Sequence, residues 1–237
     1  MLQGERILMV SYSNVSVDGA VLKIANMSDN EPGQIVRYGY PRVKELLESE
    51  TLTSYAYVLF KNPDLAESYN QLSQERKKLK KKAPRRIEIR KKMNKIREKL
   101  LEQEKQLVKN AAFVATTVSK AVVDKALYEQ KFDMVIFDET SMAYIPQVIF
   151  AASLATKHFC CLGDFKQLPA IVQSPSNIML AKNIFEHTGI TTAVENGYGH
   201  EWLVMLNYQY RMHPEIAKFV SNHMYVRLLQ SDSKIYE

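Results

Sequence analysis

The stretch VIFDETSMAYIPQ, residues 135–147, places a short apolar run directly before two adjacent carboxylates, Asp138 and Glu139. Short apolar strands that alternate with helices are typical of a parallel sheet with helices on both faces. The sequence therefore predicts an α/β fold, in which ligands bind at the carboxyl ends of the strands. Other apolar runs support this pattern: residues 7–10 and 111–117, each with a helix-like segment after it, and residues 158–162.

The composition is that of an ordinary globular protein. Hydrophobic residues make up 46% of the 237 residues and charged residues 24%, enough apolar material for a sizeable core. No apolar run approaches the roughly 20 residues that a membrane span requires, and the first residues lack the pattern of a signal peptide. The two cysteines, Cys160 and Cys161, are adjacent, which favours neither a disulfide nor a metal site. We therefore expect a reduced, cytoplasmic protein without a membrane segment.

The positive charge of the chain is concentrated in one segment. Residues 66–110 contain 16 Lys or Arg and 6 Asp or Glu, which leaves 16 basic and 20 acidic residues elsewhere. The segment has no glycine and one proline, Pro84, between two strongly helical stretches. In the second stretch apolar residues recur at alternating steps of four and three, with Gln103 in one polar slot: Ile89, Met93, Ile96, Leu100 and Leu107. This spacing is typical of a coiled-coil seam of about three heptads.

These features predict an antiparallel helical hairpin that turns near Pro84. We expect the hairpin to be an insertion, at residues 61–110, between two parts of one α/β domain at residues 1–60 and 111–237.

A dense basic block surrounds the predicted turn of the hairpin. Such density favours contact with the phosphate backbone of nucleic acid, which is sequence-independent and salt-sensitive. A solvated helical face is the simpler alternative. The candidate nucleic-acid-binding residues in the block are Arg76, Lys77, Lys78, Lys80, Lys81, Lys82, Arg85 and Arg86.

Asp138 and Glu139 stand where a strand of the predicted sheet ends. One interpretation is that they only cap the helix that follows. The other is a magnesium site, because hard cations bind carboxylate oxygens and nucleotide phosphates, and a neighbouring carboxylate can orient an attacking water. By themselves the two carboxylates do not decide between these interpretations.

Three more polar stretches fall at predicted strand ends or turns. GDFKQLPAIV, residues 163–172, adds a carboxylate and an amide. A strand is predicted from Trp202 towards LNYQYRMHPEIAKF, residues 206–219, with a polar turn and a helix after it. This stretch contains Arg211, whose guanidinium suits bidentate phosphate contact. SYSNVSVD, residues 11–18, follows the first predicted strand, where its hydroxyl and amide groups could line a phosphate backbone. Together with the two carboxylates, these stretches favour a phosphate-binding site.

In this order, the stretches resemble the motifs of superfamily 1 helicases, in the branch that contains the nonsense-mediated-decay helicase. SYSNVSVD resembles motif Ia, FDMVIFDETS the Walker B motif, GDFKQLPAIV motif III and LNYQYRMHP motif IV. The four stretches bracket nearly the whole chain, and motif III followed by QYRMHP is the most specific combination. The resemblance implies a RecA-like P-loop NTPase domain with a parallel sheet, into which the helical hairpin is inserted.

The resemblance also implies roles for individual residues. Asp138 would hold Mg²⁺ through water, and Glu139 would act as general base on the attacking water. Gln167 would sense the γ-phosphate of ATP, and Asp164 would support the same motif. Arg211 would contact the γ-phosphate.

Further residues of these motifs would contact the nucleotide base or the nucleic acid. Tyr210 would pack near the adenine, and Gln209, in the same motif, is counted with the cofactor-binding residues. Ser13 and Asn14 would touch the nucleic-acid backbone or order the loop that does. The cofactors implied are thus ATP and Mg²⁺, and the partner implied is nucleic acid, either RNA or DNA.

No P-loop sequence GxxxxGK[ST] occurs in the 237 residues. In the resembling family this loop cradles the β- and γ-phosphates and precedes motif Ia, so an N-terminal βα unit would be missing, as would the second motor domain. We expect ATP and Mg²⁺ to require a P-loop supplied in cis or in trans, and the chain alone to be a poor ATPase. Whether it is an enzyme is left open. A fragment or split product is the preferred interpretation, and a genuine truncated protein is the alternative.

The leading function is that of an ATP-dependent helicase or translocase motor domain. The alternative is a non-catalytic nucleic-acid-binding or regulatory module derived from a helicase. Nucleotide affinity separates the two, because the module would hold nucleic acid regardless of ATP.

Overall fold

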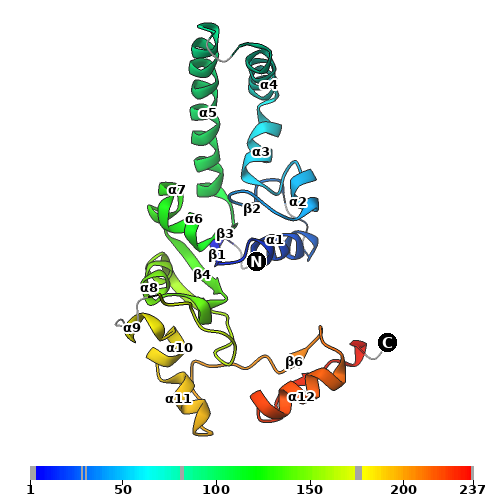
Figure 1. Cartoon of the computed structure of the whole chain (residues 1–237), viewed down its shortest axis with the longest axis vertical. Helices are drawn as coiled ribbons and strands as arrows, with labels where there is room; N and C mark the ends of the chain where they lie inside the picture. The colour runs from blue at the N-terminus through cyan, green and yellow to red at the C-terminus, as the bar shows by residue number, and fades with distance from the viewer. Residues whose placement is uncertain (1–3, 28, 30, 81–82, 174–177, 236–237) are drawn as a thin grey trace.

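The structure, a computed structural model, describes residues 4–27, 29, 31–80, 83–173 and 178–235. Within these residues, parallel strands form a five-stranded sheet of order β2–β3–β1–β4–β5 (Figure 1). The strands are β1 (Ile7–Ser11), β2 (Ile35–Arg37), β3 (Phe113–Thr117), β4 (Phe132–Asp138) and β5 (Ala155–Cys161). The predicted parallel α/β core, of the kind found in RecA-like domains, is confirmed.

Apolar residues cover both faces of the sheet. Along β1, Leu8 and Val10 lie in one hydrophobic cluster and Met9 in another, because successive side chains of a strand point to opposite faces. On the first face the helices are α6 (Val118–Val123), α7 (Lys125–Tyr128) and α8 (Ile145–Ser153). On the second face they are α1 (Asn14–Met27) and α2 (Lys44–Glu48).

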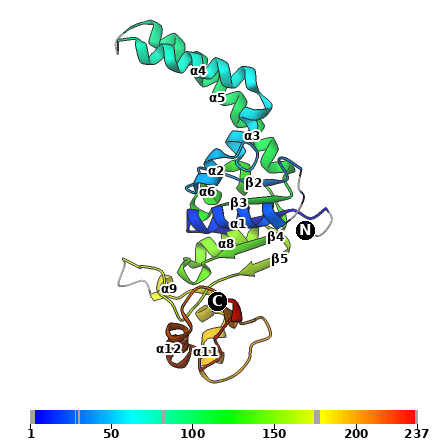
Figure 2. The same cartoon turned by 90° about the vertical axis from the view of Figure 1, so that its right-hand side faces the viewer.

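Two long helices project from this core as an antiparallel pair (Figure 2). They are α4 (Pro63–Lys78) and α5 (Arg85–Asn110), and α3 (Ser54–Lys61) leads into them. Along α5 the buried apolar residues include Ile89, Met93 and Leu100, which belong to the predicted seam. A helical hairpin at this place matches the expectation from the sequence, while its coiled-coil character and the three domain boundaries stay predictions. Across the described part of the chain, no helix is both long and apolar enough to cross a membrane.

The C-terminal part contains short elements. Its helices are α9 (Ile178–Ala181), α10 (Ile184–His187), α11 (Ile190–Glu195) and α12 (Pro214–Met224), and its strands are β6 (Tyr208–Gln209) and β7 (Gln230–Ser231). Two 3-10 helices, η1 (Thr140–Met142) and η2 (Ser233–Ile235), complete the described elements.

The strand predicted to run from Trp202 towards motif IV is much shorter in the structure. Only Tyr208–Gln209 pairs, with β7, while Trp202, Val204 and Leu206 are exposed. A strand needs a neighbouring strand for its backbone hydrogen bonds, and the described residues supply one only for these two positions. The apolar composition of this segment therefore misled the prediction.

A buried ion pair ties α1 to β2. Arg37 Nε donates to Asp18 Oδ1 over 2.6 Å, and the two side chains are 1% and 0% exposed. Asp18 Oδ2 accepts from the backbone N–H groups of Arg42 and Val43, and Arg37 Nη2 donates to Asn14 Oδ1 over 2.7 Å. A buried charge pair is favourable only when its remaining donors and acceptors are also bonded, and here the backbone and Asn14 meet that need.

We predict that Asp18→Ala destabilises the protein by about 3–5 kcal/mol, because it leaves the Arg37 guanidinium buried without its carboxylate. Urea unfolding followed by circular dichroism measures this loss. As a control, Glu48→Ala removes an exposed ion pair, in which the side chain of Lys44 is 83% exposed and that of Glu48 65% exposed. This substitution should change stability by less than about 1 kcal/mol. Equal effects of the two substitutions would contradict the prediction.

Candidate active site

Asp138 is the last residue of β4 and lies beside Ser11, the last residue of β1. The hydroxyls of Ser11 and Ser16 hydrogen-bond to its carboxylate. Burial raises the pKa of Asp138, and these hydrogen bonds partly oppose the rise. The serine-rich stretch after β1 therefore holds the carboxylate at the carboxyl edge of the sheet.

Glu139 has a left-handed backbone, with φ 59° and ψ 38°. This conformation costs a non-glycine residue about 1–2 kcal/mol, and the surrounding turn enforces it. Thr140 donates its backbone N–H to the Leu162 carbonyl over 2.8 Å, and Leu162 in turn donates to the Phe137 carbonyl over 2.8 Å. The turn after β4 is thus bonded to the segment after β5.

The charges around Glu139 come from three segments of the chain. Burial raises the pKa of Glu139, and the negative charges of Asp138 and Asp164 add to the rise, while Arg211 opposes it. The fold therefore places Asp138, Asp164 and Arg211 within electrostatic range of Glu139, and their individual roles stay predictions.

Asp164 is the centre of a hydrogen-bond cluster in the loop after β5. It accepts from the Lys166 backbone N–H over 3.0 Å and from Gln167 Nε2 over 2.8 Å. The Tyr225 hydroxyl also donates to Asp164. Sequence reasoning missed Tyr225, because it follows α12 without a motif of its own.

Gly163 permits the loop after β5 to approach the turn after β4. A Cβ on Gly163 would lie 2.9 Å from the backbone nitrogen of Ser141 and 3.1 Å from that of Thr140. Backbone atoms cannot move aside as a flexible side chain can, so only glycine fits here without a shift. This close contact sets the position of Asp164 relative to Glu139.

The turn after β6 presents Tyr210 and Arg211 to solvent, with Tyr210 68% exposed. Gln209 shapes the turn: its Oε1 accepts from the backbone N–H groups of Arg211 and Met212, over 2.9 and 2.7 Å. Its Nε2 donates to Ser231 Oγ of β7 over 2.7 Å. The amide of Gln209 is therefore occupied within the protein, whereas the exposed Arg211 side chain forms no hydrogen bond or ion pair with the described residues.

Ser13 and Asn14 use their side-chain acceptors inside the protein. Ser13 Oγ accepts from the Ser16 backbone N–H over 3.3 Å, and Asn14 Oδ1 accepts from buried Arg37. Of the two predicted roles for these residues, direct contact or ordering of the loop, the hydrogen bonds favour ordering.

The basic block of the hairpin divides into paired and unpaired residues. Arg85 pairs with Glu75 over 3.0 Å and with Glu88 over 2.8 Å, and Arg86 donates to the Leu79 carbonyl over 2.7 Å. Lys81 and Lys82 lie outside the described residues. The basic residues of the block that form neither an ion pair nor a side-chain hydrogen bond within the described chain are Arg76, Lys77, Lys78 and Lys80.

The C-terminal end of α4 and the N-terminal end of α5 lie at one end of the molecule, far from β4 (Figures 1 and 2). The structure therefore does not bring the basic block near the carboxylates.

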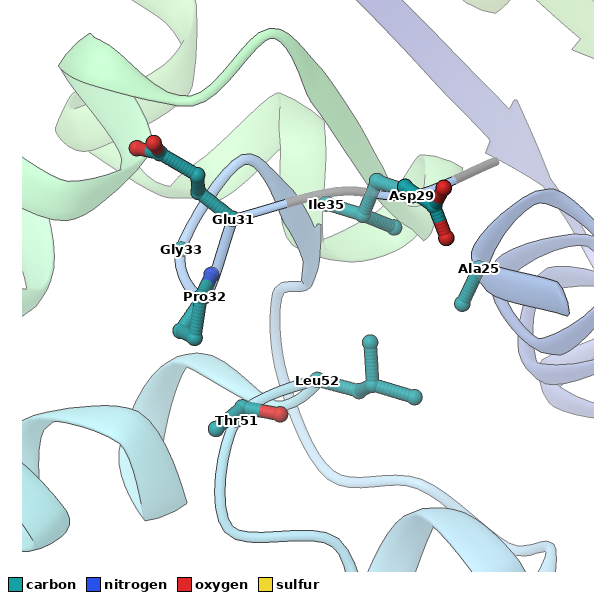
Figure 3. Close-up of a pocket in the computed structure, with 8 residues that line it drawn as sticks. All are labelled: Ala25, Asp29, Glu31, Pro32, Gly33, Ile35, Thr51 and Leu52. Carbon is teal, nitrogen blue, oxygen red and sulfur yellow. The ribbon is translucent and has the colours of Figure 1, made fainter. Parts of the chain in front are cut away.

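An open cavity of about 570 Å³ lies at the amino end of β2, beside Ile35 and Leu52 (Figure 3). Its two acidic side chains, Asp29 and Glu31, point away from each other (Figure 3). Because it lies at the edge of the sheet opposite to β4 and β5, and at the other end of the strands, it does not contribute to the candidate site.

The donor chemistry of the candidate site fits Mg²⁺ with a nucleotide. Mg²⁺ is usually held by one or two carboxylates together with phosphate oxygens and water, and Asp138 and Glu139 offer carboxylate oxygens. Among the described side chains, no group of three or more His, Cys, Asp or Glu could hold a metal ion. The arrangement therefore suits a metal that arrives with a phosphate.

We predict that Glu139→Gln stabilises the metal-free protein at neutral pH. Because the folded state raises the pKa of Glu139 above its ordinary 4.5, its ionised form disfavours folding once the pH exceeds that value. The gain in Tm should be full at neutral pH, shrink as the pH falls through the raised pKa, and vanish below about pH 4. Thermal unfolding with a chelator present measures it.

The matched control for this prediction is Glu98→Gln, on the exposed surface of α5. It should leave Tm nearly unchanged at every pH. A loss of stability in Glu139→Gln at neutral pH would contradict the electrostatic account of the cluster.

The comparisons with known proteins identify the family of the chain. A family profile described as an AAA domain matches residues 1–175, and a second profile with the same description matches residues 185–237. The chain is 29% identical to DNA polymerase alpha-associated DNA helicase A of Saccharomyces cerevisiae over 247 residues, covering 98% of this chain and 35% of that protein.

Two further relatives are similar in sequence. DNA-binding protein SMUBP-2 of Rattus norvegicus is 30% identical over 239 residues, covering 94% of this chain and 23% of the relative. ATP-dependent helicase upf1 of Schizosaccharomyces pombe is 31% identical over 130 residues, covering 54% of this chain and 13% of that protein. The chain spans about a third or less of the length of these three relatives. With the parallel sheet and the motif order, these matches establish that the chain belongs to the AAA domain family of superfamily 1 helicases, in the branch of the nonsense-mediated-decay helicase.

Proposed function

We propose that these 237 residues are the first motor domain of an ATP-dependent nucleic-acid helicase or translocase. The observation that carries the proposal is the electrostatic influence of Asp138, Asp164 and Arg211, from three separate segments, on Glu139 at the carboxyl edge of the sheet. Carboxylates beside a guanidinium, at strand ends, suit a nucleotide triphosphate with its cation. The names of the relatives, which include DNA and ATP-dependent helicases, support this choice of substrate and partner.

In this proposal each side chain has a chemical task. Mg²⁺, when bound with the nucleotide, would offset the negative charge of the phosphate groups. Asp138, held by Ser11 and Ser16, offers its oxygens to the cation's water ligands. Glu139 accepts a proton from the attacking water, and its raised pKa suits a general base better than the ordinary value does.

Arg211 and the residues of its turn act on the phosphate and the base. Arg211 compensates charge on the γ-phosphate, and Gln209 holds the turn that presents it. Tyr210, exposed beside Arg211, packs near the adenine. Gln167 senses the γ-phosphate from its place beside Asp164.

The sequence contains no GxxxxGK[ST], so a P-loop and a second motor domain, in cis or in trans, complete this site in our proposal. We predict that the purified 237-residue chain hydrolyses ATP far below the usual enzymatic rate of about 1 s⁻¹ or more, with or without single-stranded DNA or RNA. A coupled ATPase assay measures this. Turnover at an ordinary enzymatic rate would contradict the claim that the site is incomplete. If Glu139→Gln abolished that turnover, the catalytic role of Glu139 would be supported.

We also propose that the unpaired lysines of the hairpin contact the nucleic-acid backbone. The triple substitution of Lys77, Lys78 and Lys80 by Gln should weaken binding to single- or double-stranded probes and lower the slope of log K against log salt by about 2 to 3, since each lost phosphate contact removes about 0.7 to 0.9. Fluorescence anisotropy at several salt concentrations measures both effects.

The matched control substitutes three exposed lysines outside the hairpin, Lys23, Lys182 and Lys218, by Gln. It removes the same charge and should leave the salt slope nearly unchanged. An equal effect of both triple variants would mean that general charge, and not the hairpin, attracts the probe. If ATP does not change the affinity of the wild type for the nucleic-acid probe, the alternative function is favoured, that of a non-catalytic binding or regulatory module.

A further inference from the structure

Tyr225 and Gln167 donate to the same carboxylate. The Tyr225 hydroxyl and Gln167 Nε2, the latter at 2.8 Å, both donate to Oδ2 of Asp164. Tyr225 follows the last residue of α12, whereas Asp164 and Gln167 lie in the loop after β5, so the contact joins segments 61 residues apart. Neither the motifs nor the proposed chemistry uses this tyrosine.

The backbone after Tyr225 is held in a strained turn. Val226 and Arg227 have positive φ values of 50° and 64°, which is rare for non-glycine residues and unfavourable for a β-branched one. Hydrogen bonds maintain the turn: Arg227 donates its N–H to the Ser221 carbonyl over 2.9 Å, and Ser221 Oγ donates to the Leu229 carbonyl over 2.7 Å. The strained turn therefore fixes where Tyr225 points.

The hydroxyl of Tyr225 remains a donor at neutral pH. Burial raises the pKa of Tyr225 to about 12, and its hydrogen bond to Asp164 adds to the rise. The side chain of Gln167, in contrast, is exposed, so it can leave Asp164 without disturbing the core.

We propose that Tyr225 is a positioning residue for Gln167: it anchors Asp164 and keeps Oδ2 of that carboxylate hydrogen-bonded when Gln167 turns away towards a nucleotide phosphate. This inference rests on the proposed function for the phosphate, but the anchoring itself does not. Leaving a half-buried carboxylate oxygen without a side-chain donor is unfavourable. With Tyr225 in place Gln167 exchanges partners easily, and without it Gln167 stays on Asp164.

The anchoring is tested without nucleotide by hydrogen exchange of the full chain carrying Tyr225→Phe. The backbone N–H of Lys166 donates to Asp164 Oδ1, and that of Gln167 donates to the Asp164 carbonyl. Both should exchange faster than in the wild type. The matched control is Tyr198→Phe, because Tyr198 is 71% exposed and its hydroxyl makes no hydrogen bond in the described structure. Unchanged exchange at residues 163–168 in Tyr225→Phe would overturn the proposal.

The effect on Gln167 is tested by the ratio of ATP to ADP affinity with Mg²⁺, for which weak binding suffices. Tyr225→Phe should lower the preference for ATP by about 5- to 10-fold, the equivalent of one net hydrogen bond of about 1 kcal/mol or slightly more. In a Gln167→Ala background the same substitution should have no further effect, since the two residues act as one unit. Equal losses for ATP and ADP, or additive effects, would overturn the proposal and leave Tyr225 a merely structural residue.

The two experiments separate the inference from the proposed function. A preference of the wild type for ATP over ADP that Gln167→Ala leaves unchanged would refute the sensing role of Gln167 in the proposed function. Faster exchange in Tyr225→Phe would then still establish the anchoring of Asp164 by Tyr225.

Discussion

The parallel pairing of β1 with β4 is the constraint on which the candidate site depends. Its register places Ser11 beside Asp138 at the ends of the two strands. A shift of one residue would exchange the two faces of β1 and move Leu8 and Val10 out of their cluster. Since β1 is buried on both faces and paired on both sides, the register has no alternative that keeps the core.

The stretch after β1 connects this scaffold to the site. Ser11 and Ser16 hold the carboxylate of Asp138, while Asn14 and Asp18 bind the buried guanidinium of Arg37. Polar side chains from the end of β1 and the start of α1 thus serve two sites, the candidate site and a structural ion pair. The same polar stretch can therefore order the loop after β1 and also stabilise the carboxylate of Asp138, the pKa of which is raised by burial.

The two halves of the site differ in how firmly the fold holds them. Asp138 and Glu139 lie on a turn bonded to the segment after β5 and packed against Gly163. Arg211 and Tyr225 come from a segment around α12, whose buried residues are only Ala217 and Ser221. Segments with few buried contacts open at lower free energy than core strands. The Tyr225 contact with Asp164 is therefore well placed to couple the two halves.

Local patterns in the sequence were sufficient for the parallel core and the helical pair. An apolar run that ends in carboxylates predicted the end of β4 at Asp138, and the absence of glycine between residues 66 and 110 predicted long helices. The segment from Trp202 was predicted wrongly, because apolar composition does not show whether a partner strand is present. Ser13 and Asn14 looked free in the sequence because hydrogen bonds to residues such as Arg37 leave no local trace.

The sequence by itself determined the α/β order, the family and the identity of the acidic and basic groups, since all of these are recorded in short runs of residues. Only the tertiary structure decided which of these groups meet. The left-handed backbone of Glu139, the close approach at Gly163 and the contact of Tyr225 with Asp164 arise where distant segments pack together. Such contacts depend on the register of the sheet and the path of the chain across its edge, which no local pattern encodes.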